Sequence, residues 1–124
     1  MTAIRSARGK AARTSGRQAE VWAAIWLMLK GYRILGFRLK TPQAEIDVLA
    51  VKGQVLAVVE VKSRTSLTAA LEAVSYDQRQ RLRRAGRSLA AGRPALQNTA
   101  VRLDLIAMTP GRFPRHLQDA WTSD

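Results

Sequence analysis

Apolar residues concentrate in two neighbouring segments, residues 45–51 and 55–62, which are rich in β-branched and aliphatic side chains. Lys52-Gly53-Gln54 lies between them, and a Gly at such a junction is typical of a tight turn. The pattern therefore predicts a β-hairpin. An apolar segment at residues 32–39 precedes it and predicts a first strand, so the hairpin supplies the second and third strands.

A helix is predicted upstream, over about residues 16–30. Ser15 followed by Gln18 and an apolar run is a capping-box pattern, and Gly31 supplies a C-terminal stop. From Val21 onwards this segment is apolar nearly all round. That distribution indicates burial on more than one side of the helix or burial against a second subunit.

A second capping box, Ser75 with Gln78, predicts a helix that runs to about Ala91 before Gly92. The preceding residues 63–68 are expected to form a polar loop.

Residues 100–108 predict a fourth strand, and the remainder to Trp121 is expected to be irregular. The order α-β-β-β-α-β predicts an α/β fold in which helices flank a mixed β-sheet.

The register of the hairpin decides which side chains meet. If Lys52-Gly53 is the two-residue loop, Asp47 faces Val58, and Asp47, Glu60 and Lys62 share one face of the sheet. Asp47 and Glu60 are then diagonal neighbours, with Cβ atoms somewhat under about 7 to 8 Å apart. Two carboxylates at that separation repel unless a positive charge lies between them, and a hard divalent metal ion meets that requirement. The alternative is a half-solvated sheet face, on which alternating charges are ordinary.

The net charge of the chain indicates what kind of partner it binds. The 124 residues, enough for one domain, include 21 Lys and Arg against 9 Asp and Glu, a net charge of +12. Such an excess favours polyanions, most often nucleic acid, with a membrane surface as the rival.

Residues 1–15 are expected to be a disordered basic arm and 16–124 a single domain. The longest apolar run is too short for a transmembrane helix, and the lack of cysteine fits a reducing cytoplasm.

Further charged residues are candidates for the site or for phosphate contact. Glu20 is the only acid among residues 1–44 and stands on an apolar helical stripe, where pairing with Arg17 would be a purely structural explanation. On the second helix Arg79, Arg83 and Arg87 recur every four residues. A solvated face is the ordinary interpretation of such a stripe, but together with the arm and Arg64 it favours phosphate contact.

Two other polar residues receive structural interpretations. Asp104 is expected to pair with one of the stripe arginines, and His116 to be a surface or packing residue in an irregular tail.

These motifs together resemble a known family. The set comprises Gly16-x-x-x-Glu20, Glu45-Ile46-Asp47, Val59-Glu60-Val61-Lys62-x-Arg64 and the Arg-rich helix that ends before Leu103-Asp104. In this order it resembles the YraN family of uncharacterised bacterial proteins, which are similar to PD-(D/E)XK nucleases of the restriction-endonuclease-like superfamily. The resemblance covers about residues 16–121.

The resemblance implies a restriction-endonuclease-like core and a Mg²⁺-dependent (or Mn²⁺-dependent) phosphodiesterase site. Asp47, Glu60 and the main-chain carbonyl of Val61 would be metal ligands. Lys62 would orient or activate the attacking water, and Glu20 would complete the acidic site.

We therefore expect a cytoplasmic endonuclease acting on DNA, with branched or flapped structures among its substrates. The alternatives are a non-catalytic basic protein that binds nucleic acid with the same fold, and an RNA-associated structural component. A two-fold homodimer would account for the apolar first helix, although burial within the fold would account for it equally well.

Overall fold

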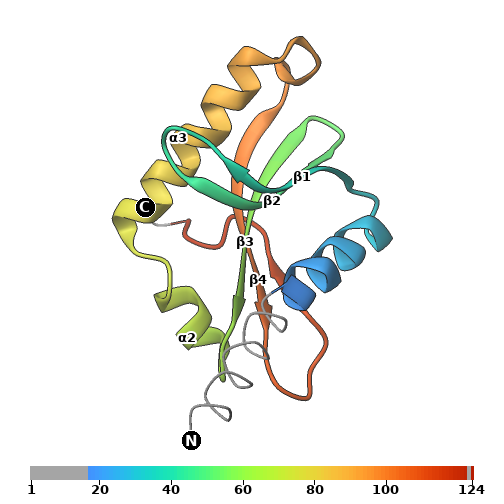
Figure 1. Ribbon diagram of the computed structural model, residues 1–124, viewed down its shortest axis with the longest axis vertical. Coiled ribbons are helices and arrows are strands. Elements are labelled where there is room, and N and C mark those ends of the chain that lie inside the picture. The colour runs from blue at the N-terminus through green and yellow to red at the C-terminus, as the bar shows by residue number, and fades with distance from the viewer. Residues whose placement is uncertain (1–16, 123) are drawn as a thin grey trace, which may run out of the picture.

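The computed structural model describes residues 17–122 and 124, in which helices cover both faces of a five-stranded sheet (Figure 1). The expected basic arm, residues 1–15, and the Ser15 cap lie outside these residues. An N-terminal helix, described over residues 17–29, comes first. The other elements are β1 (Arg33–Lys40), β2 (Glu45–Lys52), β3 (Val55–Ser63), α2 (Leu67–Glu72), α3 (Tyr76–Gly92), a 3₁₀ turn η1 (Pro94–Leu96), β4 (Ala100–Met108) and β5 (Arg115–Leu117).

The strands lie in the order β1-β2-β3-β4-β5, and only the β3–β4 pair is parallel. A parallel pair needs a crossover connection, and α2 and α3 provide it. This confirms the expected mixed α/β sheet flanked by helices. Two elements were not expected: α2 occupies part of the predicted loop, and β5 lies in the predicted irregular tail, where it pairs with β4.

The hairpin exists, but its predicted register is wrong by two residues. Val51 pairs with Leu56 and Val48 with Val59, so the turn is Gly53-Gln54 rather than Lys52-Gly53. Gly53 adopts a φ of +58°, the left-handed conformation that such a turn favours in glycine. Because side chains alternate with period two, a register shift of two residues leaves each side chain of the ladder on the face predicted for it.

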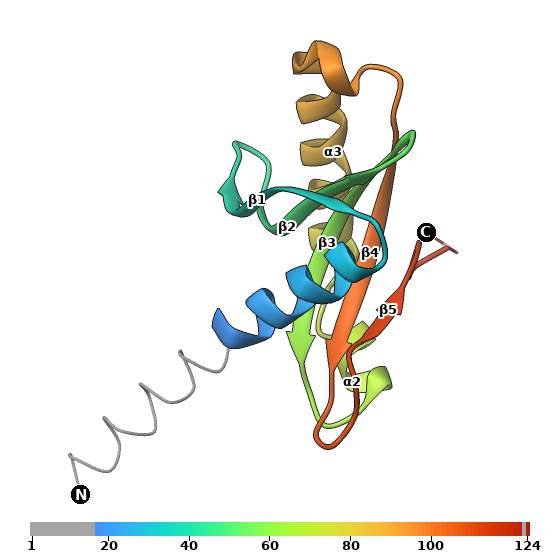
Figure 2. The same ribbon diagram turned by 90° about the vertical axis from the view of Figure 1, so that its right-hand side faces the viewer.

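The sheet carries a hydrophobic core on each face. On one face, Leu82 and Ala85 of α3 pack against a cluster that includes Leu49, Leu56 and Val58. On the other face, the N-terminal helix packs against a cluster that includes Val48, Ala50, Ala57, Val59 and Ile106. Figure 2, turned by 90°, shows the sheet between the N-terminal helix and α3.

Within the described residues the N-terminal helix is buried on one side only, so of the two predicted explanations, burial on several sides within the fold is not observed, and burial against a second subunit is not tested. Ala23 and Leu27 are fully covered, whereas a second stripe remains exposed and comprises Val21, Trp22, Ile25, Met28 and Leu29. Trp22 is 59% and Leu29 77% exposed. Gly31, at a φ of +92°, ends the helix as predicted.

Within the described part of the chain, no helix is both long and apolar enough to cross a bilayer.

Candidate functional site

Two acidic residues lie where β2 and β3 stop pairing. The last paired residues are Val48 and Val59, so Asp47 and Glu60 are the first residues of the two strands beyond the ladder, and not the diagonal pair that the predicted register gave. The Asp47 carboxylate accepts a hydrogen bond from the Val61 N–H at 2.9 Å. At this end of the hairpin, the side chain of Asp47 thus replaces a main-chain carbonyl as the acceptor for the Val61 N–H.

Glu60 is a buried carboxylate with incomplete pairing. It is 2% exposed, and its Oε2 atom lies 3.9 Å from Nζ of Lys62. Its Oε1 atom is buried and has no hydrogen-bond partner among the described residues. Because an unpaired buried charge is costly, natural proteins keep such a group only where something compensates it.

The electrostatics of the pair follow from this geometry. Burial and, after it, the neighbouring Asp47 carboxylate raise the pKa of Glu60 to about 8, although the Lys62 ammonium acts in the opposite direction. Burial also raises the pKa of Asp47, while the Val61 N–H lowers it and Glu20 raises it. Two facing carboxylates in a poorly solvated place resist a second negative charge. The pair therefore attracts either a proton or a cation.

Glu20 reaches the same region from the N-terminal helix. Its Oε2 atom accepts a hydrogen bond from Nε of Arg38 at 2.6 Å, so its partner is Arg38 rather than Arg17. The β1–β2 register places Arg38 between Phe37 and Leu39, opposite Asp47. The acidic site thus has a cation on each side of Asp47, Arg38 from β1 and Lys62 from β3.

Arg38 was not among the site residues predicted from the sequence. Its backbone has a φ of +45°, which is uncommon for a residue other than glycine and costs of order 1–3 kcal/mol. Strain of this kind concentrates at functional sites. The available signal was a charged residue between the apolar side chains of Phe37 and Leu39.

The residues present supply part of the ligand set that a hard divalent cation needs. Asp47 and Glu60 offer carboxylate oxygens, one of them buried and unpaired, and oxygen ligands are what Mg²⁺ prefers. No third His, Cys, Asp or Glu completes a cluster within the described ranges, 17–122 and 124. A cation held here would take its remaining ligands from main-chain carbonyls, water or a phosphate, as Mg²⁺ usually does.

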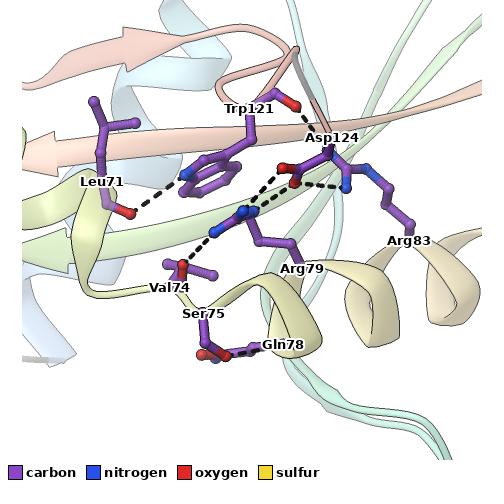
Figure 3. A network of polar contacts seen from close by, with 8 residues as sticks. All are labelled: Leu71, Val74, Ser75, Gln78, Arg79, Arg83, Trp121 and Asp124. Atoms are coloured by element: carbon purple, nitrogen blue, oxygen red, sulfur yellow. Dashed lines mark hydrogen bonds and ion pairs between the residues drawn. The ribbon is translucent and has the colours of Figure 1, made fainter.

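The predicted phosphate-binding arginines fall into two groups. Arg64 and Arg87 are exposed. Arg79 and Arg83, by contrast, both make ion pairs with Asp124, at 2.5 and 3.0 Å (Figure 3). The periodic spacing on α3 gave no indication of this acidic partner, because Asp124 is more than 40 residues away along the chain.

A second polar cluster corrects two expectations. Asp104 is fully buried and pairs with Arg102 of its own strand, at 2.8 Å, instead of with an arginine of α3. His116 lies on β5 and donates from Nε2 to Asp104 at 2.8 Å. Its Nδ1 must accept from the Lys30 ammonium at 2.7 Å, because an ammonium can only donate. His116 therefore belongs to a network that joins β4 to β5.

Comparisons with known proteins agree on one family. The family described as "Uncharacterised protein family UPF0102" matches residues 19–108. A UPF0102 protein of Caulobacter sp. (strain K31) is 70% identical over 96% of this chain and 86% of its own length. One from Paramagnetospirillum magneticum is 44% identical, over 93% of this chain and 92% of its own. One from Agrobacterium fabrum is 40% identical, over 94% and 95%.

Proposed function

The chain belongs to the uncharacterised protein family UPF0102, and we propose that it is a metal-dependent endonuclease whose site is built on Asp47 and Glu60. The observation that carries the proposal is the buried, unpaired Oε1 atom of Glu60 beside a second carboxylate. The resemblance to PD-(D/E)XK nucleases gives the same residues. Phosphodiester hydrolysis is the reaction that this combination of acids and lysine serves.

Asp47 and Glu60 would hold Mg²⁺ or Mn²⁺, with the Val61 carbonyl as a further ligand. When bound, such an ion polarises a phosphoryl oxygen and lowers the pKa of a coordinated water. The Lys62 ammonium, beside Glu60, would orient the attacking water and stabilise negative charge that develops on the phosphate. Glu20 would keep Arg38 in place next to Asp47.

The net charge of +12 supports nucleic acid as the substrate. Arg64 and Arg87 are exposed and available for backbone phosphates, which carry no sequence information directly. We therefore propose DNA recognised by shape, with branched or flapped structures among the substrates. The absence of cysteine is in keeping with a cytoplasmic enzyme.

The test is cleavage of junction, flap and linear DNA in the presence of Mg²⁺ or Mn²⁺. Wild type should cleave at least one substrate, and Asp47→Ala and Lys62→Met should each lose the activity. Because Asp47 also accepts from the Val61 N–H, circular dichroism has to show that Asp47→Ala is folded. Equal cleavage by wild type and folded variants would refute the proposal.

A second candidate function is a basic nucleic-acid-binding protein without catalysis. The observation that favours it is that no group of three His, Cys, Asp or Glu side chains within the described residues is placed to hold a metal ion. It predicts salt-sensitive binding that is indifferent to Mg²⁺ and to Asp47. Stronger binding to RNA than to DNA of the same shape would favour an RNA-associated role.

We also propose self-association through the N-terminal helix. Its exposed stripe, which includes Trp22 and Leu29, is the kind of apolar surface that marks an interaction site. A homodimer would cover this stripe, and light scattering would detect it.

A further inference from the structure

The carboxylate of Asp124 lies in a fork made by two arginines of α3. Arg79 binds it through both Nε and Nη2, at 2.5 and 2.8 Å, and Arg83 adds a contact at 3.0 Å (Figure 3). Arg79 lowers the pKa of Asp124 to about 2, and Arg83 contributes to the same shift. A bidentate arginine with a second arginine beside it is the geometry that binds either a carboxylate or a phosphate.

Other contacts hold the fork in place independently of Asp124. Arg79 donates from Nη1 to the Val74 carbonyl at 2.7 Å, and its guanidinium lies 5.6 Å from the Tyr76 ring and 5.5 Å from the Trp121 ring. Arg83 donates to the Trp121 carbonyl at 3.1 Å. The two guanidinium groups are therefore oriented before any anion arrives.

The segment that supports the fork is itself anchored. The Trp121 indole N–H donates to the Leu71 carbonyl at 3.3 Å, and the Ala120 N–H donates to the Leu103 carbonyl at 3.2 Å. Neither contact involves Asp124. If the Asp124 carboxylate left the fork, Arg79 and Arg83 would therefore keep their positions, and their two positive charges would lose this partner.

The fork lies on the same side of the sheet as Glu60 and Lys62. Alternation places Glu60 and Lys62 on the side of β3 that carries Leu56 and Val58, the side covered by α3. Because β3 and β4 are parallel, the crossover returns along the sheet: α2 lies beside the end of β3, and α3 then runs back along the same side (Figure 1). Arg79 and Arg83 belong to the first turns of this helix.

We propose that Arg79 and Arg83 form a phosphate-binding subsite for a nucleic-acid backbone, and that the carboxylate of Asp124 occupies this subsite until a phosphate displaces it. The ring of Tyr76, which is 61% exposed beside Arg79, would stack on a base next to that phosphate. This inference rests on the proposed function in taking nucleic acid as the ligand. It adds a second contact point on the face of the sheet that carries Glu60 and Lys62.

The test compares two variants of the 124-residue chain, each of which loses one negative charge. Asp124→Asn takes the competing carboxylate out of the fork. Asp77→Asn is the matched control, because Asp77 makes an exposed pair with Arg81 on the same helix. Affinity for a fluorescein-labelled DNA junction is measured in EDTA by anisotropy, so that cleavage plays no part.

Asp124→Asn should bind about tenfold more tightly than Asp77→Asn, since charge-assisted contacts to two arginines become free for phosphate. The double variant Asp124→Asn/Arg83→Gln should lose that gain. Equal affinities of the two single variants would overturn the inference.

Cleavage by the wild type in Mg²⁺ is measured in parallel, which separates the two proposals. If the wild type cleaves DNA but Asp124→Asn binds no better than Asp77→Asn, only the subsite is refuted. If Asp124→Asn gains affinity but no protein cleaves, the subsite stands and the endonuclease proposal fails.

Discussion

Replacing Glu60 by Gln should change how the stability of the metal-free protein depends on pH. In the folded protein, burial and the neighbouring Asp47 hold the pKa of Glu60 at about 8, compared with 4.5 for an ordinary glutamate. Between these two values the unfolded chain has released the proton and the folded chain has kept it. The free energy of unfolding therefore falls as pH rises through this window.

The size of the effect follows from the same two values. Each pH unit between 4.5 and about 8 costs about 1.4 kcal/mol, so the loss across the window is about 5 kcal/mol. Stability is fully present below about pH 4.5 and reaches its reduced value above about pH 8. Gln keeps the shape and cannot ionise, so the contribution of this position to the slope disappears in Glu60→Gln.

Urea unfolding in EDTA, repeated across the window, measures the effect. Wild type should lose stability steadily with rising pH, and Glu60→Gln should exceed wild type at the alkaline end. Glu72→Gln is the matched control, because Glu72 is exposed at the end of α2 and should leave the profile of the wild type unchanged. Parallel profiles for wild type and Glu60→Gln would refute a buried, uncompensated carboxylate at this position.

Further substitutions test the packing of α3 on the sheet and the polar network around Asp104. Gly86→Ala would place a Cβ atom 2.7 Å from Cγ2 of Val58 and should cost about 1–3 kcal/mol, whereas Gly92→Ala meets no atom within 4 Å and should be close to neutral. Chemical denaturation compares them, and equal effects would contradict the close approach of α3 to β3. Asp104→Asn should cost about 3–5 kcal/mol, because it removes the charge of a fully buried carboxylate that is paired with Arg102. A thermal shift no larger than that of Asp77→Asn would contradict that role.

The sequence predicted those features that depend on neighbouring residues. The Ser75 side chain accepts from the Gln78 N–H at 3.1 Å, as the capping box implies, and the strand predicted at residues 100–108 is present with those bounds. Both are local patterns, because the conformation of each residue depends mainly on its neighbours in the sequence. The acids of the hairpin were predicted on one face because alternation alone decides the face.

Features that depend on distant residues could not be predicted in this way. The turn slipped by two residues because several two-residue loops are compatible with Lys52-Gly53-Gln54, and packing across the sheet selects one. β5 was missed because three residues carry too little periodicity to predict a strand. The pairing of Arg79 and Arg83 with Asp124 depends on how the end of the chain folds back over α3.

The hydrogen bond from the Val61 N–H to Asp47 offers a built-in spectroscopic probe. This amide senses the carboxylate directly, so its proton chemical shift and its rate of exchange with deuterated solvent should respond when Asp47 gains a proton or a cation. Nuclear magnetic resonance of the ¹⁵N-labelled chain could therefore follow occupancy of the site through one backbone signal, without substrate and before any turnover is known.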